Sequence, residues 1–156
     1  MKVIFFDVDY VLNHEGSKSK FGDWRGVDSY HVKQLKKVVD ETNAILVLSS
    51  SWRLNLNYLG EEMEQPMEYL KKRLGKYGLH ISSVTPNIKW NKRGEEIKKW
   101  LDDNNDVEIE SFVILDDEEF DYKKQNLLDN FVRTTWDYGL TEKEAEEAIK
   151  ILGVKK

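Results

Sequence analysis

The sequence has no cysteine, only two prolines and no long hydrophobic run. Without cysteine the protein can form neither a disulfide bond nor a thiolate metal site. No apolar run approaches the roughly 20 residues that a membrane-spanning helix needs. The start, Met1-Lys2-Val3, leads directly into an apolar stretch, so we expect no signal peptide. We therefore expect a cytoplasmic protein without a membrane partner.

Neither sign of charge dominates the chain. Its 156 residues include 24 Lys and Arg against 29 Asp and Glu, which gives a formal net charge of −5. This balance argues mildly against a protein that coats nucleic acid non-specifically, although a local basic rim can still bind a nucleic-acid end. Hydrophobic residues make up 40% of the chain, which is ordinary for a globular protein with a substantial core. We expect residues 1–156 to form a single domain.

Strand and helix signals alternate along the chain. Residues 13–27 are polar and contain glycine, so we expect an active-site loop there. Thr141 and Glu144 match a capping box that begins the last helix. This alternation predicts an α/β fold, a Rossmann-like parallel sheet with helices on both faces. The expected strands are 3–6, 44–48, 79–84, 112–115 and 131–134, and the expected helices are 28–41, 60–76 with a bend at Pro66, 93–103 and the one from Thr141.

Three of the predicted strands end in polar or acidic residues. Asp7 and Asp9 follow the first strand, spaced so that both carboxylates point the same way if the backbone stays extended. The run Ser-Ser-Ser-Trp-Arg follows the strand 44–48, and Asp116-Asp117 follows the strand 112–115. Ligands of such sheets bind beyond the carboxyl ends of the strands, so we expect these residues to form one site. The alternative is that Asp7 and Asp9 are turn or cap residues after an edge strand.

The order of these motifs resembles the haloacid dehalogenase (HAD) superfamily of phosphohydrolases. The matching segments are DVDxVLN, VLSSSWR, RGEEIKKWL, FVILDD and GLTEKEAEEAIKIL, which extend over nearly the whole chain. The amino-acid sequences of these motifs are most similar to those of small, capless HAD domains that are associated with RNA-repair and polynucleotide phosphatases. The resemblance implies a HAD-type fold and a phosphatase, that is, a phosphoric monoester hydrolase.

The acidic residues suit the hydrolysis of a phosphate monoester. A carboxylate can divide this very slow reaction into two easier displacements through an aspartyl-phosphate, and Asp7 fits that nucleophile. Attack by an anion on a phosphate dianion requires charge neutralisation, for which Mg²⁺ with oxygen ligands is suited. We expect Asp7, Asp116, Asp117 and the backbone carbonyl of Asp9 to bind this ion. The Asp9 side chain is expected to act as general acid and then as general base, which requires a raised pKa.

Serine and basic residues are the candidates for contacts to the phosphoryl group. Ser49 is the expected hydrogen-bond donor to a phosphoryl oxygen, with Ser50 as the fallback, and the alternative for both is simple turn chemistry. Lys92 and Arg93 compete to neutralise the developing charge, and the resemblance favours Arg93. The alternative is that Lys92 and Arg93 are exposed residues at the start of a helix and have no role in catalysis. Arg53 is a candidate for binding a second substrate phosphate or the leaving group.

One residue departs from the family pattern. HAD phosphatases usually carry glycine directly after the second aspartate, where this chain has Tyr10. Glycine allows a positive φ angle and a close approach of the backbone. We expect Tyr10 to narrow the site, to stack on the substrate, or to distort the turn that carries Asp9.

A tryptophan, several acidic residues and the three histidines are expected to have structural rather than catalytic roles. Trp52 is expected in the core, with stacking on a base as the alternative. The acidic residues after Asp117, among them Asp121, are expected mostly in a solvated loop. His14, His31 and His80 show no ligand spacing and are expected at the surface or in loops.

The gaps between the motifs leave little room for a cap domain. Neither residues 13–43 nor residues 54–91 can hold their predicted elements and also a separate cap of about 50 residues or more. An open site suits the end of a polynucleotide, so the leading hypothesis is a Mg²⁺-dependent phosphomonoesterase that acts on a nucleic-acid 3′-phosphate or a nucleotide. The alternatives are a small-molecule phosphatase or nucleotidase, and a catalytically silent HAD-like binding module.

Overall fold

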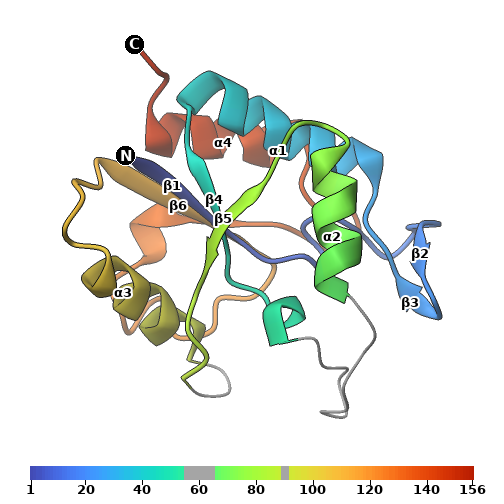
Figure 1. Cartoon of the computed structure of the whole chain (residues 1–156), viewed down its shortest axis with the longest axis horizontal. Helices are drawn as coiled ribbons and strands as arrows, with labels where there is room; N and C mark the ends of the chain where they lie inside the picture. Colours follow the sequence, from blue (N-terminus) through green and yellow to red (C-terminus); the bar gives the residue numbers. More distant parts are fainter. Residues whose placement is uncertain (55–65, 89–91) are drawn as a thin grey trace.

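The computed structural model describes residues 1–54, 66–88 and 92–156. Its main sheet has five parallel strands in the order β5-β4-β1-β6-β7 (Figure 1). The predicted parallel α/β sheet is thus confirmed. The strands are β1 (Lys2–Phe6), β4 (Ile45–Leu48), β5 (Ile81–Val84), β6 (Ser111–Asp116) and β7 (Phe131–Arg133).

Helices cover both faces of this sheet, as predicted. The helices are α1 (Ser29–Thr42), α2 (Pro66–Gly75), α3 (Arg93–Asp103) and α4 (Glu142–Leu152). Helices α1 and α4 lie against each other on one face, and α3 lies on the opposite face (Figure 1). The predicted capping box between Thr141 and Glu144 is present at the start of α4. Residues 60–65 of the predicted helix 60–76 lie outside the described residues.

The alternation of side chains along β1 separates two hydrophobic clusters. Ile4 and Phe6 belong to the larger cluster, which includes residues of α1, α2 and α4. Val3 and Phe5 belong to the smaller cluster beneath α3, where the rings of Phe5 and Trp100 meet edge to face at 5.3 Å. Burying each of these side chains contributes about 1.5–3 kcal/mol. Because both faces of β1 are buried, its carboxyl end has a fixed position in the middle of the sheet.

Part of the predicted loop 13–27 is a small hairpin. The strands β2 (Lys20–Phe21) and β3 (Trp24–Arg25) pair antiparallel, and Gly22 between them has a φ of 60°. The ring of Phe21 stacks on Tyr69 of α2 at 4.9 Å. The hairpin is far smaller than a domain, and the described part of the chain contains no separate cap, as predicted.

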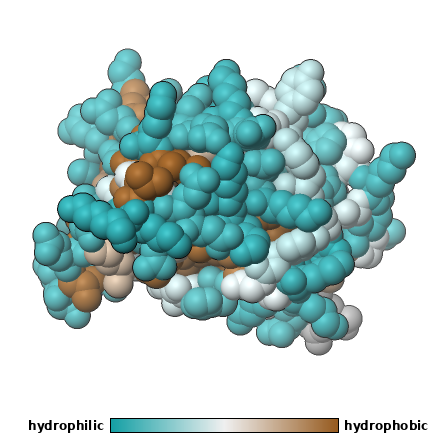
Figure 2. Space-filling model, turned by 90° about the horizontal axis from the view of Figure 1, so that it is seen from above, coloured by the Kyte–Doolittle hydropathy of each residue, from teal (hydrophilic) through white to brown (hydrophobic). Residues whose placement is uncertain are grey.

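The face of the molecule formed by α1 and α4 is largely polar. Figure 2 looks onto the molecule from above the α1 and α4 side and shows mainly hydrophilic side chains around a limited hydrophobic area. Among the described helices, none is both long and apolar enough to cross a membrane.

Candidate active site

The carboxyl ends of β1, β4 and β6 meet in the middle of the sheet. The amide of Asp7 donates to the carbonyl of Leu115 at 3.0 Å, and the amide of Ser49 donates to the carbonyl of Phe6 at 2.9 Å. These bonds continue the strand pairing by one residue and hold the three chain segments side by side. As a result, one carboxylate oxygen from each of Asp7, Asp116 and Asp117 lies within 4.8 Å of the others.

A basic side chain from the start of α3 completes this cluster. Arg93 Nη1 lies 2.7 Å from Asp116 Oδ2 and 3.3 Å from Asp7 Oδ2. Burial alone would lower the pKa of Arg93, but Asp7 and then Asp116 outweigh it and raise the pKa, so the guanidinium stays charged. Its central carbon also lies 4.3 Å from the centre of the Phe120 ring, a cation–π distance. Of the two competing cations, Arg93 therefore reaches the carboxylates, whereas Lys92 lines an open hollow beside them.

The start of α3 is held in place by Asp121. Its carboxylate accepts hydrogen bonds from the amides of Gly94 at 2.6 Å and Glu95 at 3.2 Å. A Cβ atom at position 94 would lie only 2.8 Å from Asp121 Oδ1, which explains the glycine beside Arg93. Glu118 and Glu119 are exposed, as expected for an acidic run that is mostly solvated loop, whereas Asp121 is the member of this run that is buried.

Asp9 lies next to the carboxylate cluster and has its own partners. Asn13 Nδ2 donates to Asp9 Oδ1 at 3.1 Å, and the indole Nε1 of Trp52 donates to Asp9 Oδ2 at 3.1 Å. Burial, and then the negative charge of Asp7, raise the pKa of Asp9, while the bonds from Asn13 and Trp52 oppose this shift. Trp52 is half-buried and packs on the core, as predicted, but its indole nitrogen also orients Asp9.

Tyr10 adopts the backbone conformation that favours glycine. Its φ is 62°, in the left-handed region, which costs an ordinary side chain about 1–2 kcal/mol. The turn is nevertheless held at both ends of the residue, because the Tyr10 amide donates to Asn13 Oδ1 at 2.7 Å and its carbonyl accepts from Thr134 Oγ1 at 2.6 Å. The ring packs against Trp136 with centroids 5.6 Å apart, and Arg25 lies 5.1 Å over it.

The serines after β4 differ in their hydrogen bonds. The Ser49 hydroxyl is fully buried and has no hydrogen-bond partner within residues 1–54, 66–88 and 92–156. The Ser50 hydroxyl accepts from the amide of Trp52 at 3.2 Å, as a turn residue does. The Ser49 hydroxyl thus has no partner among the described residues, whereas the Ser50 hydroxyl uses its acceptor and keeps its donor, so the choice between the two serines stays a prediction.

Arg53 makes a structural ion pair. Its Nη2 lies 2.8 Å from Glu96 Oε2 on α3, and its other nitrogens donate to the carbonyls of Ser50 and Thr85. Only 5% of its side chain is exposed. Arg53 therefore joins the short 3₁₀ helix η1 (Ser51–Leu54) to α3. The function proposed below does not use the predicted binding of a second substrate phosphate or the leaving group by Arg53.

Two aromatic residues that the sequence did not single out contact the metal-ligand candidates. The hydroxyl of Tyr122, which is fully buried, donates to Asp116 Oδ2 at 3.0 Å. The indole Nε1 of Trp136 donates to Asp117 Oδ2 at 3.0 Å. Neither residue belongs to a periodic pattern or a motif, so no signal in the sequence marked them.

The carboxylate cluster fits a hard divalent cation. Burial, and then the charge of Asp7, raise the pKa of both Asp116 and Asp117, and Arg93 opposes this shift at Asp116 without reversing it. Carboxylate oxygens at this spacing are the donors that Mg²⁺ prefers, and positive charge there relieves the repulsion among them. Asp7, Asp116 and Asp117 can therefore hold the ion; the backbone carbonyl of Asp9 as a further ligand stays a prediction.

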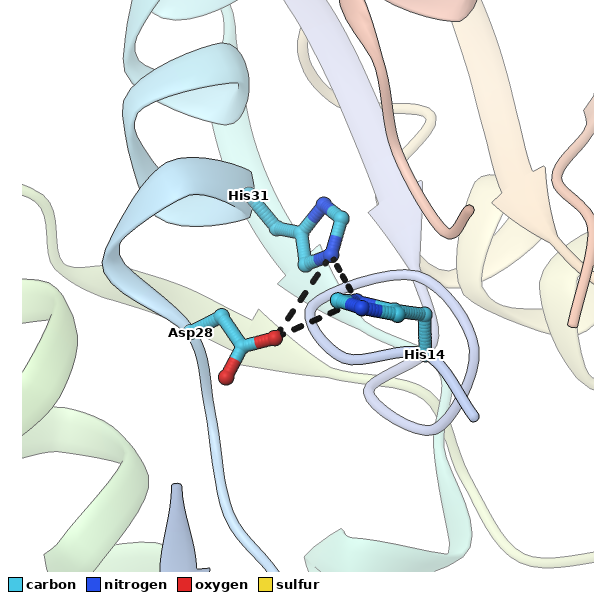
Figure 3. Close-up of side chains that lie close together, drawn as sticks. All are labelled: His14, Asp28 and His31. Atoms are coloured by element: carbon cyan, nitrogen blue, oxygen red, sulfur yellow. Dashed lines mark hydrogen bonds and ion pairs between the residues drawn. The ribbon is translucent and has the colours of Figure 1, made fainter. Parts of the chain in front are cut away.

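The histidines are not scattered as expected. His31 is only 1% exposed, and its Nε2 lies 3.0 Å from His14 Nδ1 (Figure 3). Asp28 joins the two rings in a second cluster outside the carboxylate site. His80 lies at the surface and His14 lies in a loop, as predicted, so only the buried His31 of α1 departs from the expectation.

Comparison with known proteins agrees with this geometry. No curated protein matches the chain. The model of one protein family, described as the HAD domain in Swiss Army Knife RNA repair proteins, matches residues 3–145. This match covers the strands, the carboxylate cluster and Arg93. The chain therefore belongs to the HAD superfamily, within the family of small HAD domains of Swiss Army Knife RNA repair proteins.

Proposed function

We propose that this protein is a Mg²⁺-dependent phosphomonoesterase that works through an aspartyl-phosphate and acts on the 3′-phosphate of a polynucleotide. The observation that carries the proposal is the position of Asp7, whose carboxylate lies 3.3 Å from Arg93 and within 4.8 Å of the carboxylate oxygens of Asp116 and Asp117. Asp9, with its raised pKa, lies two residues further along the same loop.

In the first half of the reaction, an oxygen of the Asp7 carboxylate attacks phosphorus and the bond from phosphorus to the leaving oxygen breaks. Asp9 gives its proton to that leaving oxygen, because its raised pKa keeps the acid form present at higher pH than for an ordinary aspartate. Asp7, Asp116 and Asp117 would hold Mg²⁺, and the bound ion would supply charge neutralisation between the anionic nucleophile and the phosphate. Arg93 can donate to a phosphoryl oxygen from its place beside Asp7.

In the second half, Asp9 acts as the base. Water attacks phosphorus of the aspartyl-phosphate, its proton passes to Asp9, and the bond between phosphorus and the Asp7 oxygen breaks. Inorganic phosphate leaves and both aspartates return to their starting states. The buried Ser49 hydroxyl is a suitable donor to a phosphoryl oxygen in both halves, since it has no partner in the described part of the chain.

The surroundings of the site support a nucleic-acid end as the substrate. Trp136 is 56% exposed and packs on Tyr10, with Arg25 over the Tyr10 ring. Aromatic faces beside a cation are the surfaces on which unpaired bases stack. Because the Trp136 indole is hydrogen-bonded to Asp117, a base on this surface would lie near the reacting phosphate.

A hollow on the Arg93 side offers further positive charge. It has a volume of about 830 Å³ and opens beside Phe120, the ring on which Arg93 lies. Three lysines at its border suit the backbone phosphates of a polynucleotide. The lining residues are Lys92, Glu118, Phe120, Asp121, Lys123 and Lys124.

A panel of substrates tests this proposal. Phosphate release is measured with Mg²⁺ from a generic aryl phosphate, from nucleoside monophosphates, and from oligonucleotides that carry a 3′- or a 5′-phosphate. We expect the 3′-phosphorylated oligonucleotide to be fastest, with release lost in Asp7→Asn and in excess chelator. Faster hydrolysis of free nucleotides would instead favour a nucleotidase. No release from any substrate by the folded, Mg²⁺-bound protein would favour a silent binding module.

A further inference from the structure

The second cluster of titratable side chains lies on the other side of the loop that carries Asp9. His14 follows that loop, Asp28 directly precedes α1, and His31 lies in the first turn of α1 (Figure 3). The distances are 3.0 Å from His14 Nδ1 to His31 Nε2, 3.3 Å from His14 Nδ1 to Asp28 Oδ2, and 3.8 Å from His31 Nε2 to the same oxygen. Three atoms that can each bind a metal thus face one point.

These distances match the edges of a tetrahedral metal site. Zinc binds histidine nitrogen and carboxylate oxygen at about 2.0–2.2 Å, so neighbouring ligand atoms of a tetrahedron are about 3.3–3.5 Å apart. The three observed distances, 3.0, 3.3 and 3.8 Å, lie on both sides of that value. Shifts of a few tenths of an ångström in the side chains suffice to place an ion between them.

The contacts of His31 orient its imidazole ring for metal binding. Its Nδ1 lies 2.7 Å from the carbonyl oxygen of Leu140, which can only accept a hydrogen bond. Nδ1 therefore carries the proton, and Nε2 keeps a lone pair directed into the cluster. A backbone carbonyl on the far nitrogen is the usual support of a metal-binding histidine.

Two further contacts fix the cluster. The hydroxyl of Ser17 donates a short hydrogen bond to Asp28 Oδ2, which orients the carboxylate. Gly139 packs against the imidazole so closely that a Cβ atom there would lie 2.9 Å from Cε1 of His31. The rings and the carboxylate are therefore held before any ligand arrives.

We propose that His14, Asp28 and His31 bind a divalent transition-metal ion, with Zn²⁺ as the best match and a water molecule as the fourth ligand. Two imidazoles and one carboxylate suit Zn²⁺, whereas the carboxylates of Asp7, Asp116 and Asp117 suit Mg²⁺. The part of the chain that the structure describes would thus offer two metal sites of different chemistry.

The position of the site indicates what the ion does. His14 directly follows Asn13, whose amide group orients both Asp9 Oδ1 and the Tyr10 amide. An ion bound to His14, Asp28 and His31 would tie this loop to the start of α1. The three ligands act as positioning residues, and none of them contacts the reacting groups.

Metal titration tests the proposal. Zn²⁺ is added to the metal-free protein in excess Mg²⁺, and binding is followed by calorimetry in the wild type and in His14→Gln. His14 is partly exposed, so this variant is expected to fold, which circular dichroism checks. We expect one Zn²⁺ per chain, bound at least about 10-fold more weakly by His14→Gln, since losing a ligand costs no less than losing a supporting contact. His80→Gln and Asp117→Asn are the controls, and both should bind Zn²⁺ as the wild type does.

Imidazole nitrogen NMR of the wild type provides the second measurement. On adding Zn²⁺ the signals of His14 Nδ1 and His31 Nε2 should shift together, while those of His80 stay in place. The proposal is overturned if Zn²⁺ leaves these two signals unchanged, or if Zn²⁺ binding is lost in Asp117→Asn but kept in His14→Gln. Either result would make the cluster a hydrogen-bonded structural contact between the loop and α1.

Discussion

Arg93 reaches from the first turn of α3 to Asp116 at the end of β6, with 2.7 Å between Nη1 and Asp116 Oδ2. The same nitrogen lies 3.3 Å from Asp7 Oδ2. One guanidinium thus contacts carboxylates from two neighbouring strands, at the place where the proposed mechanism requires a phosphoryl group to be neutralised. The neighbouring cation, Lys92, borders the hollow instead.

Replacing Arg93 should therefore affect catalysis more than replacing Lys92. We expect Arg93→Ala to lower kcat on an aryl phosphate by about 100-fold to 1,000-fold, because it removes a preorganised donor to the phosphoryl group. Lys92→Ala is the matched control and should change kcat little. Steady-state kinetics of the two variants decides whether Arg93 or Lys92 contacts the phosphoryl group. A larger loss of kcat in Lys92→Ala than in Arg93→Ala would assign this contact to Lys92.

The Trp52 indole should tune the proton on Asp9. Its hydrogen bond favours the charged carboxylate and so lowers the pKa of Asp9 against the rise caused by burial and Asp7. Removing that bond in Trp52→Phe should raise this pKa further. Because the reaction needs the protonated acid, activity falls as pH rises through the pKa of Asp9, and this alkaline limb should move to higher pH in the variant.

The pH dependence of kcat with a poor leaving group is the measurement. Trp24→Phe, on the exposed hairpin strand β3, serves as the control and should leave the profile in place. An alkaline limb that moves to lower pH in Trp52→Phe would contradict the assignment of Asp9.

Gly94 and Gly75 should respond differently to alanine. A Cβ atom at position 94 meets Asp121 Oδ1 at 2.8 Å, so Gly94→Ala should lower the free energy of unfolding by about 1–3 kcal/mol. At position 75, at the end of α2, an added Cβ would meet no described residue within 4 Å apart from its chain neighbours and the backbone of its own helix, so Gly75→Ala should be neutral or stabilising by up to about 1 kcal/mol. Urea unfolding of both variants is the measurement, and equal effects would show that Asp121 does not restrict position 94.

Tyr10→Gly should separate the two effects of this residue. Glycine relieves the strain of a φ of 62°, so the variant should be no less stable than the wild type. The packing with Trp136 is lost, however, and with it a surface for stacking a base. We expect KM for the oligonucleotide to rise by a factor equivalent to about 1–3 kcal/mol, while KM for an aryl phosphate stays the same. An equal change for both substrates would speak against base stacking at Tyr10.

The sequence was most informative where chain direction and periodicity determine position. Asp7 and Asp116 were placed together correctly because parallel strands end at one edge of a sheet, and each follows an apolar run. The helix predicted over residues 93–103 matches α3, which buries Ile97 and Trp100 at helical spacing on one side. These are properties of local stretches of sequence.

Contacts between distant, non-periodic residues could not be predicted in this way. Arg53 was expected to face the substrate, but its partner Glu96 lies 43 residues away and is brought to it by the packing of α3. His14 and Asp28 likewise meet His31 only because the loop folds back on the start of α1. The spacing of residues along the sequence does not predict which side chains such a loop brings together.

The central claim is that Asp7 attacks phosphorus. Rapid acid quenching during turnover of the 3′-phosphorylated oligonucleotide, followed by mass spectrometry of the protein and its peptides, tests it most directly. We expect one phosphoryl group on the peptide that contains Asp7 in the wild type, and none in Asp7→Asn. A phosphoryl group on Ser49, or undiminished phosphate release by Asp7→Asn, would contradict it.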